Sequence, residues 1–370
     1  MIRMGLVGGG PGSFIGPVHR IAAELDRRIV LVAGAFSSDA ARSQAAAATY
    51  GLSPDRAYSS LEAMIAGEAG RPDGIEMVAI ATPNHLHLPQ ARMALAAGLA
   101  VMSDKPATAT LAEARELAEV VASARQPYRL TFTYTGYPMV REMRARIAAG
   151  EIGQVRKVVV EYFQGWLSDR VEDHGSKQAA WRVDPAQAGL GGCIGDIGVH
   201  AFNIAEFVTG DVVVAINPEL AAVVDGRALD DDCTVLLRFG GGARGILAAS
   251  QIATGERNNL RLRVFGETGN MEWSHEACDR LTLTDAGGST RTLFAGSGAV
   301  GPAAVAASRL PAGHPEGYLE AFGNLYRDFA GLLRGEPAPQ LPGIADGLRS
   351  MAFVETAVRC NGQGWTKLYI

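Results

Sequence analysis

The chain has 370 residues, of which 48% are hydrophobic and 20% are charged, and its formal net charge at pH 7 is −5. This length is typical of two domains and excludes a single small domain. The acidic balance, with no cluster of Lys and Arg, argues against nucleic-acid binding and favours a small-molecule partner.

The cysteines and the hydrophobic runs indicate the class of protein. Cys193, Cys233, Cys278 and Cys360 have no spacing typical of a zinc site, so we expect reduced thiols and no metal. The first residues, MIRMGLVGGGPG, lack the charged region and apolar core of a secretion signal, and no run of about 20 apolar residues occurs. We therefore expect a soluble cytoplasmic protein without membrane contact.

The first third of the chain alternates strand and helix patterns. Apolar runs of strand length occur at MIRMGLVG, IVLVAGAF, IEMVAIA and LAVMSD. Helical spacing occurs between and after them, at PVHRIAAELDRR, DAARSQAAAATYG, HLHLPQARMALAAG and LAEARELAEVVASAR. Strands that are apolar throughout and separated by helices predict a parallel, doubly wound α/β sheet. We expect YRLTFTY to close this Rossmann domain, which then spans residues 1–134.

The pattern changes after a helix at PMVREMRARIAAG. Strand patterns follow at VRKVVVEYF, VVVAINPELAAVV, CTVLLRF, RGILAASQIA, LRLRVFGETGNMEW and RLTLTD. The turns FGGGAR and GETGN indicate hairpins, so residues 135–370 are predicted to form an α+β domain with a large, mostly antiparallel open sheet. Residues 285–312 are predicted to be a long surface loop. Two helices are expected near 315–334 and 343–360, and the C-terminal helix can pack back on the first domain.

The glycine-rich segment GLVGGGPGSFIGPVHR follows the first strand and precedes a helix. A dinucleotide-binding loop needs glycine at the turn, glycine beside the pyrophosphate, and a helix N-terminus that binds the phosphate charge. Gly8, Gly10 and Gly16 fit the glycine positions, although the loop is about three residues longer than GxGxxG. A glycine-rich turn that binds nothing is the alternative. The residues predicted here to bind a cofactor are Gly8, Gly10, Gly12, Ser13, Phe14 and Ile15.

The acid that reads the ribose of NAD is expected after the second strand, in AFSSDAAR. Ser37 and Ser38 occupy the nearest places, Asp39 follows, and Arg42 could reach a 2′-phosphate. Asp39 favours NAD, whereas the serines and Arg42 leave NADP open.

Polar residues also follow the third and fourth strands, in ATPNHLHLPQA and MSDKPAT. In an open α/β sheet, ligands lie beyond the carboxyl ends of the strands, so Lys105 is predicted to point into the ligand crevice and not into solvent. Of His85 and His87, we expect one at the nicotinamide end of the cofactor and one packing its helix. The further predicted cofactor residues are Thr82, Pro83, Asn84, His87, Asp104 and Lys105.

The segment GGCIGDIGVHAF places Asp196 and His200 four residues apart among glycine and apolar residues. On a helix this spacing puts both side chains on one face. Because an unpaired buried charge is costly, the two are either a satisfied core pair or part of a catalytic site.

Taken together, these motifs resemble the Gfo/Idh/MocA oxidoreductases, the family of glucose–fructose oxidoreductase and inositol dehydrogenase. The resemblance covers essentially the whole chain: the glycine loop with His19 after it, TPNHLH at 82–87, DKP at 104–106 in place of EKP, and GGCIGDIGVH at 191–200 in place of GGGxxxDxGxH. The departures are the longer glycine loop, Asp104 in place of Glu, and Asn203 where an acid is often found.

The resemblance implies a Rossmann domain that binds NAD or NADP and a second domain whose open sheet often mediates dimers or tetramers. It also implies a catalytic Lys, Asp and His, which correspond to Lys105, Asp196 and His200. In alcohol oxidation, His200 would take the hydroxyl proton, because an imidazole titrates near neutral pH. Asp196 would orient that ring or a second hydroxyl, and Lys105 would stabilise the developing alkoxide.

Other residues are candidates for the wall of the substrate site. Aromatic faces cover the C–H side of a sugar, while charged groups bind its hydroxyls. For Trp181, Tyr318 and His314 a packing or structural role is the alternative, and Asp230–Asp232 are predicted to be a solvated turn, not a metal site. The predicted substrate residues are Lys105, Tyr134, Tyr137, Trp181, Arg182, Asp196, His200 and His314, with Asp184 and Tyr318 as further candidates.

The leading hypothesis is an NAD-dependent dehydrogenase of a cyclic polyol or sugar, with myo- or scyllo-inositol first and a pyranose next. One alternative is an NADP-dependent keto-sugar reductase. Another is an enzyme that cleaves glycosides through transient oxidation by tightly bound NAD. A nucleotide-sensing repressor is disfavoured, because it would not need Lys105, Asp196 and His200. We also expect a homo-oligomer, either a dimer or a tetramer.

Overall fold

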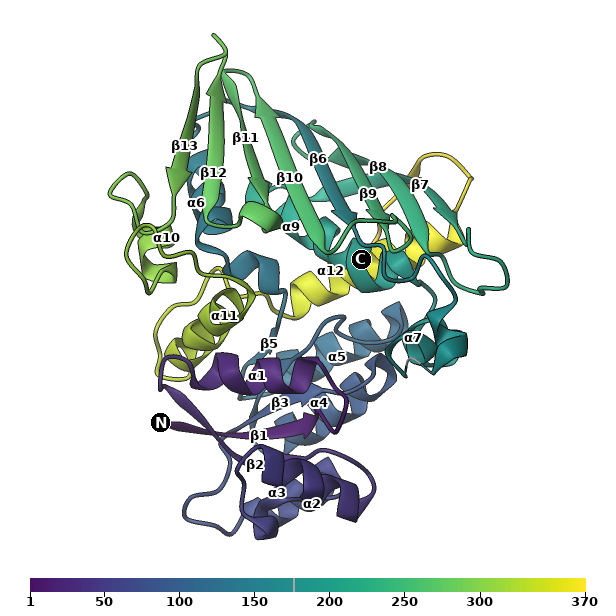
Figure 1. Ribbon diagram of the computed structural model, residues 1–370, viewed down its shortest axis with the longest axis vertical. Coiled ribbons are helices and arrows are strands. Elements are labelled where there is room, and N and C mark those ends of the chain that lie inside the picture. The colour runs from purple at the N-terminus through teal and green to yellow at the C-terminus, as the bar shows by residue number, and fades with distance from the viewer. Residues whose placement is uncertain (176) are drawn as a thin grey trace. The chain divides into compact units, whose positions relative to one another are not determined.

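The computed structural model describes residues 1–175 and 177–370, apart from the side chains at positions 177, 178, 181 and 186. The chain divides into two compact units, each with its own sheet (Figure 1). The first unit comprises Met1–Thr133 and Tyr318–Leu348, and the second comprises Tyr134–Gly317 and Arg349–Ile370. The predicted boundary between residues 134 and 135 lies one residue from the observed boundary between Thr133 and Tyr134. The prediction assigned residues 318–348 to the second domain, whereas they belong to the first unit.

The first unit is built on a five-stranded parallel sheet with the order β2-β1-β3-β4-β5. β3 and β4 are buried along their whole length, as expected for strands with helices on both faces. This confirms the predicted Rossmann sheet. Its strands are β1 (Ile2–Gly8), β2 (Ile29–Ala35), β3 (Met77–Ala81), β4 (Ala100–Ser103) and β5 (Tyr128–Leu130).

Helices cover this sheet, and one of them comes from near the end of the chain. Phe322, Tyr326 and Phe329 on α11 join the core that β1 and α1 form, so α11 packs against α1. The helices of this unit are α1 (Ile15–Glu24), α2 (Ala40–Thr49), α3 (Leu61–Glu68), α4 (His87–Ala96), α5 (Leu111–Ser123) and α11 (Tyr318–Leu332).

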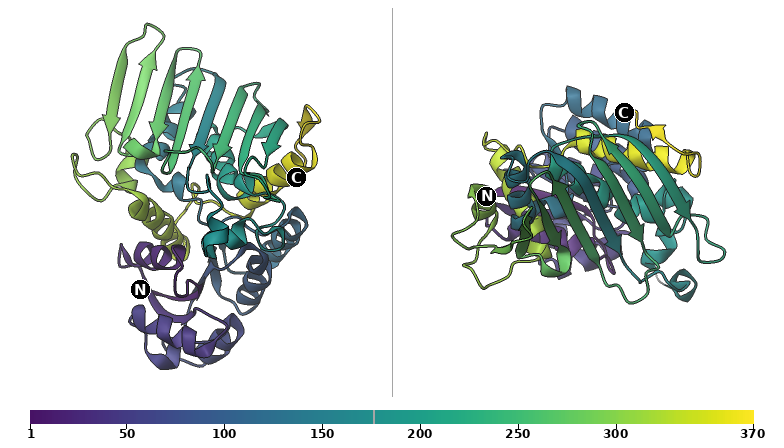
Figure 2. Two further views of the ribbon diagram at one scale, coloured as in Figure 1. Left: turned by 45° about the vertical axis from the view of Figure 1, so that its right-hand side comes forward. Right: turned by 90° about the horizontal axis from the view of Figure 1, so that it is seen from above.

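The second unit contains, among the described residues, a nine-stranded sheet with the order β13-β12-β11-β10-β6-β9-β8-β7-β14 (Figure 2). The predicted mostly antiparallel sheet is confirmed, because β6 and β9 alone among these described neighbours run parallel. The strands are β6 (Val155–Phe163), β7 (Val213–Ala221), β8 (Asp232–Phe239), β9 (Arg244–Ser250), β10 (Asn259–Gly266), β11 (Gly269–Ser274), β12 (Arg280–Asp285), β13 (Thr290–Phe294) and β14 (Thr366–Lys367).

One face of this large sheet is covered and the other is open. Burial alternates strictly along β8, whose outward residues are exposed. On the covered face, α9 packs against β6 and β9, and α6 packs against β11 and β12. The helices of the unit are α6 (Pro138–Ala148), α7 (Lys177–Arg182), α8 (Pro185–Ala188), α9 (Val199–Thr209) and α10 (Pro302–Ala307); α12 (Ile344–Arg359) has its larger part here. In the described part of the chain no helix is both long and apolar enough to span a bilayer.

The prediction of a long loop over 285–312 was wrong. β13 pairs with β12 as a hairpin through the turn at 286–289, and α10 starts with Pro302. The abundance of Gly, Ala and Ser concealed the short TRTLF strand, whose pairing depends on an edge that β12 supplies.

Candidate active site

The glycine loop joins β1 to α1 through a backbone that only glycine adopts easily. Gly8, Gly9 and Gly12 have φ values of +87°, +73° and +84°. A Cβ added to Gly8 would lie 2.3 Å from the carbonyl oxygen of Ala81 on β3. The loop therefore turns sharply at the carboxyl end of β1, where a Rossmann fold binds its cofactor.

Gly16 lies against this loop from the first turn of α1. A Cβ on Gly16 would lie 2.3 Å from the Cα of Gly9, and the hydroxyl of Tyr50 donates a hydrogen bond to the carbonyl of Gly9 at 2.8 Å. Gly16 thus permits the close contact of helix and strand that the third glycine of a dinucleotide loop provides. Gly10 faces β2, because its added Cβ would lie 2.4 Å from the carbonyl oxygen of Phe36.

The extra residues of the loop lead directly into α1. Ser13 donates its backbone N–H to Gly10 at 3.0 Å and accepts the N–H of Gly16 on its hydroxyl at 3.3 Å. Phe14 is exposed, and α1 begins at Ile15 with no acidic side chain in its first turn. The positive end of the helix dipole therefore carries no carboxylate that would repel a phosphate.

The residues after β2 have a structural role that the sequence did not indicate. Asp39 is the N-cap of α2, since its carboxylate accepts the backbone N–H of Arg42 at 2.7 Å. Its own N–H donates to the hydroxyl of Ser37 at 3.2 Å. Asp39 and Arg42 are both exposed, so one acid both caps the helix and remains accessible to a ribose.

His87, the first residue of α4, connects the two loops that follow β3 and β4. Its Nδ1 lies 2.7 Å from the carbonyl oxygen of Pro106, and its Nε2 lies 2.8 Å from the carbonyl oxygen of Thr82. The ring is almost completely buried, and burial lowers the pKa of His87. Both nitrogens face backbone, so His87 holds the loops together, whereas His85 is exposed.

Asp104 fastens the loop that carries Lys105. One carboxylate oxygen accepts the backbone N–H of Lys105 at 2.9 Å and the hydroxyl of Thr131 at 2.8 Å. Lys105 itself is partly exposed, and its peptide bond to Pro106 is cis. Asp104 therefore bridges the end of β4 to the segment after β5.

In the second unit, Asp196 lies on a π-helical turn that precedes α9. The turn spans Ile194–Gly198 and continues directly into α9, where His200 is buried at 8% exposure. The expectation of one regular α-helical face was therefore wrong. A π turn widens the helix, and such turns are frequent at functional sites.

The carboxylate of Asp196 is held by two side chains. Its Oδ2 accepts hydrogen bonds from Arg182 Nε at 3.0 Å and from Gln251 Nε2 at 2.9 Å. Arg182 ends α7, and Gln251 follows the last residue of β9. A cation and an amide donor together stabilise the ionised carboxylate and fix its orientation.

Aromatic rings surround His200. The ring of Tyr134 meets it edge-on at 5.0 Å, and the ring of Tyr162 lies 6.2 Å away. The hydroxyls of these two tyrosines are hydrogen-bonded at 2.5 Å, and burial raises the pKa of Tyr134 to about 12. Tyr134 is therefore neutral at physiological pH, and its ring packs edge-on against the imidazole of His200.

The structure places the remaining substrate candidates differently. Arg182 contacts Asp196 directly, while Tyr137 is fully buried and packs on Trp273 at 5.3 Å. His314 is exposed in the segment between α10 and α11. The side chain of Trp181 lies outside the described residues. Asp184 accepts a hydrogen bond from Gln187. Tyr318 lies in the first unit, where its ring faces Phe14, and Asn203 is buried in α9.

Sequence reasoning missed Gln251 and the segment at 164–166. Both follow the carboxyl ends of strands, which is the signal that located Lys105. The mostly antiparallel pattern of this half gives no sign that β6 and β9 run parallel and end at the same edge.

The prediction that Asp230–Asp232 form a solvated turn was wrong. The two oxygens of Asp230 accept the N–H groups of Gly192 and Ile194, each at 2.7 Å, and burial raises the pKa of Asp230 to about 6. Asp231 is 2% exposed and accepts hydrogen bonds from the N–H groups of Val223 and Val224. These acids anchor backbone, including the start of the turn that carries Asp196.

Two cysteines lie beside Asp230. One ligand atom from each of Cys193, Asp230 and Cys233 lies within 4.8 Å of the others, and both cysteines are buried. The Asp230 oxygens already accept backbone N–H groups, and burial raises the pKa of the Cys193 thiol. The raised pKa favours a protonated Cys193, and the Asp230 oxygens are already used by backbone, so both features favour a packed cluster over a metal site.

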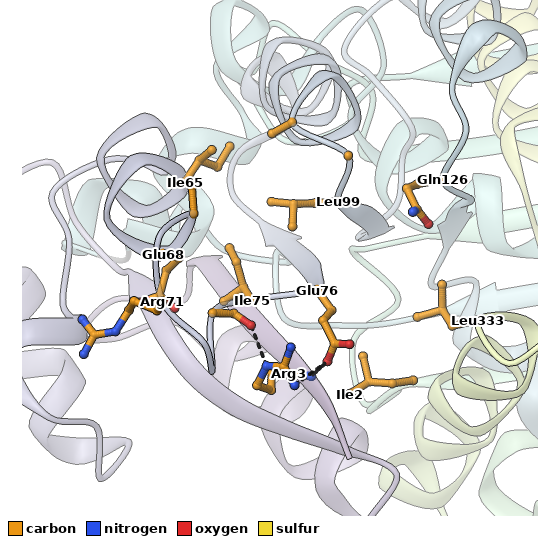
Figure 3. Close-up of a pocket in the computed structure, with 14 residues that line it drawn as sticks. Ile2, Arg3, Ile65, Glu68, Arg71, Ile75, Glu76, Leu99, Gln126 and Leu333 are labelled. Atoms are coloured by element: carbon orange, nitrogen blue, oxygen red, sulfur yellow. Dashed lines mark hydrogen bonds and ion pairs between the residues drawn. The ribbon is translucent and has the colours of Figure 1, made fainter.

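A hollow of about 550 Å³ lies at the opposite end of the Rossmann sheet (Figure 3). Arg3 and Glu76 face each other there at 3.3 Å, and Glu68 pairs with Arg56. The hollow lies at the amino ends of β1 and β3, not at the carboxyl ends where such sheets bind ligands. Its charges are paired within the protein, so we assign it no role.

Comparison with known proteins agrees with the geometry of each unit. Residues 2–132 match the model of the oxidoreductase family with an NAD-binding Rossmann fold, and residues 140–272 match the GFO/IDH/MocA C-terminal domain. The uncharacterized oxidoreductase YfiI of Bacillus subtilis is 33% identical over 98% of this chain and 95% of its own length.

Solved structures are also similar. The inositol dehydrogenase homolog of Azotobacter vinelandii, in complex with NAD⁺, has a TM-score of 0.94 and 35% identity, covering 99% of this chain and 97% of that chain. The complex of an inositol dehydrogenase homolog from the same organism with NADH and myo-inositol has a TM-score of 0.91 and 34% identity, with the same coverage.

Proposed function

Because the chain belongs to the Gfo/Idh/MocA family of NAD-binding oxidoreductases, we propose that it oxidises a secondary hydroxyl of a cyclic polyol or sugar. The observation that carries this proposal is the carboxylate of Asp196, held by Arg182 and Gln251 on the turn that leads to His200. A fixed carboxylate, a nearby cation and an imidazole are the groups that bind hydroxyls and take a proton from one of them.

We propose NAD as the cofactor, held by the residues that surround the carboxyl ends of β1, β2, β3 and β4. The close approach of Gly16 to Gly9 and the unopposed N-terminus of α1 fit a pyrophosphate. Asp39 is the candidate for the ribose hydroxyls. The other candidates are Gly8, Gly10, Gly12, Ser13, Phe14, Ile15, Ser37, Arg42, Thr82, Pro83, Asn84, Asp104 and Lys105, with His87 holding the loops.

The proposed reaction removes a hydride from carbon and a proton from oxygen. A bound nicotinamide would supply the acceptor for the hydride. His200 takes the hydroxyl proton, and the Tyr134 ring keeps its imidazole in place. Asp196 binds a neighbouring hydroxyl, with its direction fixed by Arg182 and Gln251. The ammonium of Lys105 stabilises the negative charge that develops on the substrate oxygen.

The favoured substrate is an inositol, with a pyranose next. The similar protein solved with NADH and myo-inositol supports the cyclitol. We further propose that the protein is a cytoplasmic homo-oligomer, a dimer or a tetramer, which light scattering of the purified protein would measure.

The deciding experiment mixes the purified protein with NAD⁺ or NADP⁺ and a panel of inositols, aldoses and glycosides, and it follows nicotinamide absorbance together with product analysis. We expect reduction of NAD⁺ with at least one compound and loss of turnover in His200→Ala, while NADH still binds. His174→Ala is the matched control, since His174 is an exposed histidine of the same unit.

Other outcomes would favour the alternatives. A preference for NADPH with a keto-sugar would indicate the reductase. Cleavage of a glycoside by protein that retains NAD, without net reduction, would indicate transient oxidation. If His200→Ala retains full turnover, the proposed role of His200 is wrong.

A further inference from the structure

The loop after β6 presents a tryptophan at the edge of the Asp196 site. Gln164 donates its N–H to the carbonyl of Ser250 at 2.8 Å, and Leu167 donates its N–H to the carbonyl of Gln251 at 3.0 Å. A Cβ at Gly165 would lie 2.7 Å from the carbonyl oxygen of Ala253. The loop is therefore pressed against the segment that follows β9, and Trp166 is fixed at its tip.

The side chain of Trp166 is exposed but oriented. Its ring N–H donates to Gln164 Oε1 at 2.8 Å, while 36% of the residue remains accessible. The Gln164 amide in turn donates to Asn258 Oδ1 at 2.6 Å, and Tyr162 donates to the same oxygen at 2.8 Å. A chain of hydrogen bonds thus connects Trp166 to the tyrosines that surround His200.

Arg182 links Trp166 to the catalytic carboxylate. The guanidinium carbon of Arg182 lies 5.9 Å from the centre of the Trp166 ring, and its Nε donates to Asp196 at 3.0 Å. One arginine therefore separates an exposed aromatic face from Asp196. A second ring attached to a sugar at Asp196 can extend across Arg182 to the exposed face of Trp166.

We propose that Trp166 and Arg182 form a subsite for a second saccharide ring, so that a glycoside of the cyclitol or sugar is preferred over the free ring. This inference rests on the proposed function and specifies its substrate. The flat C–H face of a sugar packs on an aromatic ring, and the guanidinium donates hydrogen bonds to the hydroxyls at the ring edge. The sugar ring that lies at Asp196 and His200 is oxidised, and the second sugar ring, which packs on Trp166, contributes binding energy.

The test compares each parent compound with its glycoside in the presence of NAD⁺. The pairs are D-glucose with cellobiose and with maltose, and myo-inositol with its galactoside. We expect at least one glycoside to have a higher kcat/KM than its parent. Trp166→Ala should lower kcat/KM for that glycoside by about tenfold and leave the parent within about twofold.

Two variants control for misfolding and for general effects of an exposed ring. Trp166→Phe keeps an aromatic face and should retain most of the preference. Trp365 is 40% exposed and has Arg238 at 3.9 Å from its ring centre, so Trp365→Ala removes a similar pair elsewhere in the unit. We expect Trp365→Ala to leave kcat/KM unchanged for both the parent compound and the glycoside.

Binding measurements separate this inference from the proposed function. Calorimetry on the NADH-loaded protein should show tighter binding of the glycoside than of its parent, and Trp166→Ala should remove the difference. If no compound reduces NAD⁺, the proposed function fails, and the binding comparison still decides the subsite. The subsite proposal would be overturned if every glycoside binds no more tightly than its parent compound. It would also be overturned if Trp166→Ala lowers the affinity for parent and glycoside equally.

Discussion

The Nδ1 atom of His87 lies 2.7 Å from the carbonyl oxygen of Pro106, the residue that follows Lys105. The other ring nitrogen lies 2.8 Å from the carbonyl oxygen of Thr82. A neutral imidazole carries one N–H and donates to one carbonyl at a time, and burial favours that neutral form. Through this ring, the loop that carries Lys105 is positioned by the loop after β3.

Replacing His87 should therefore weaken cofactor binding. We expect His87→Phe to raise the Kd for NADH about tenfold, because a buried hydrogen bond between the loops contributes about 1 kcal/mol and its carbonyl is left unpaired. Titration of NADH fluorescence measures this Kd. His174→Phe is the control, and an unchanged Kd in His87→Phe would contradict the role of the ring.

Gln251 should affect the substrate and not the cofactor. Gln251→Met removes the amide that donates to Asp196 at 2.9 Å but keeps the length of the side chain. We expect kcat/KM for the substrate to fall about tenfold, since one hydrogen bond to a charged group is worth about 1.5–3 kcal/mol. The Kd for NADH should stay unchanged. A proportional loss in both would indicate a general folding defect.

Gly16 should tolerate no side chain. In Gly16→Ala, the new Cβ would meet the Gly9 backbone at 2.3 Å and the Tyr50 hydroxyl at 2.8 Å. We expect a loss of roughly 2 kcal/mol in the free energy of unfolding, of the size typical for overpacking, together with weaker NADH binding. Gly70→Ala is the matched control in the same unit, because a Cβ there meets no atom within 4 Å. Urea denaturation of both variants measures the loss in the free energy of unfolding that each substitution causes.

The buried His19 should make stability depend on pH. Its Nδ1 lies 2.6 Å from the Tyr326 hydroxyl, and burial lowers the pKa of His19 to about 4, with Asp104 raising it and His87 lowering it further. The unfolded chain, with a pKa near 6.5, binds a proton between pH 6.5 and 4 that the folded chain does not bind. Stability is therefore complete above pH 6.5 and decreases as the pH falls toward 4.

This dependence can be measured with His19→Gln, which cannot titrate. We expect the difference in the free energy of unfolding between pH 7.5 and 4.5 to be about 2 kcal/mol smaller than in the unaltered protein. Urea denaturation at both pH values measures it. An equal pH dependence in both proteins would mean that His19 has the same pKa in the folded and unfolded states, which would contradict the lowered pKa.

The sequence by itself determined the fold class and the local chemistry of the loops. Apolar runs of strand length, separated by helical spacing, predict a parallel sheet because such strands must be covered on both faces. Gly8 ends β1, and Asp104 and Lys105 come immediately after β4, so their place at the carboxyl ends of the sheet is fixed by position along the chain. These features depend on neighbours in sequence, and sequence patterns therefore predict them.

Only the tertiary structure decided which distant residues surround Asp196. Gln251 reaches it because β6 and β9 run parallel, and no local pattern distinguishes that pair from its antiparallel neighbours. Asp230 and Asp231 look like a solvated turn, but backbone amides from other segments face them. Contacts between segments far apart in the chain depend on how strands pair and helices pack, and the energy of those contacts does not appear in any short stretch of sequence.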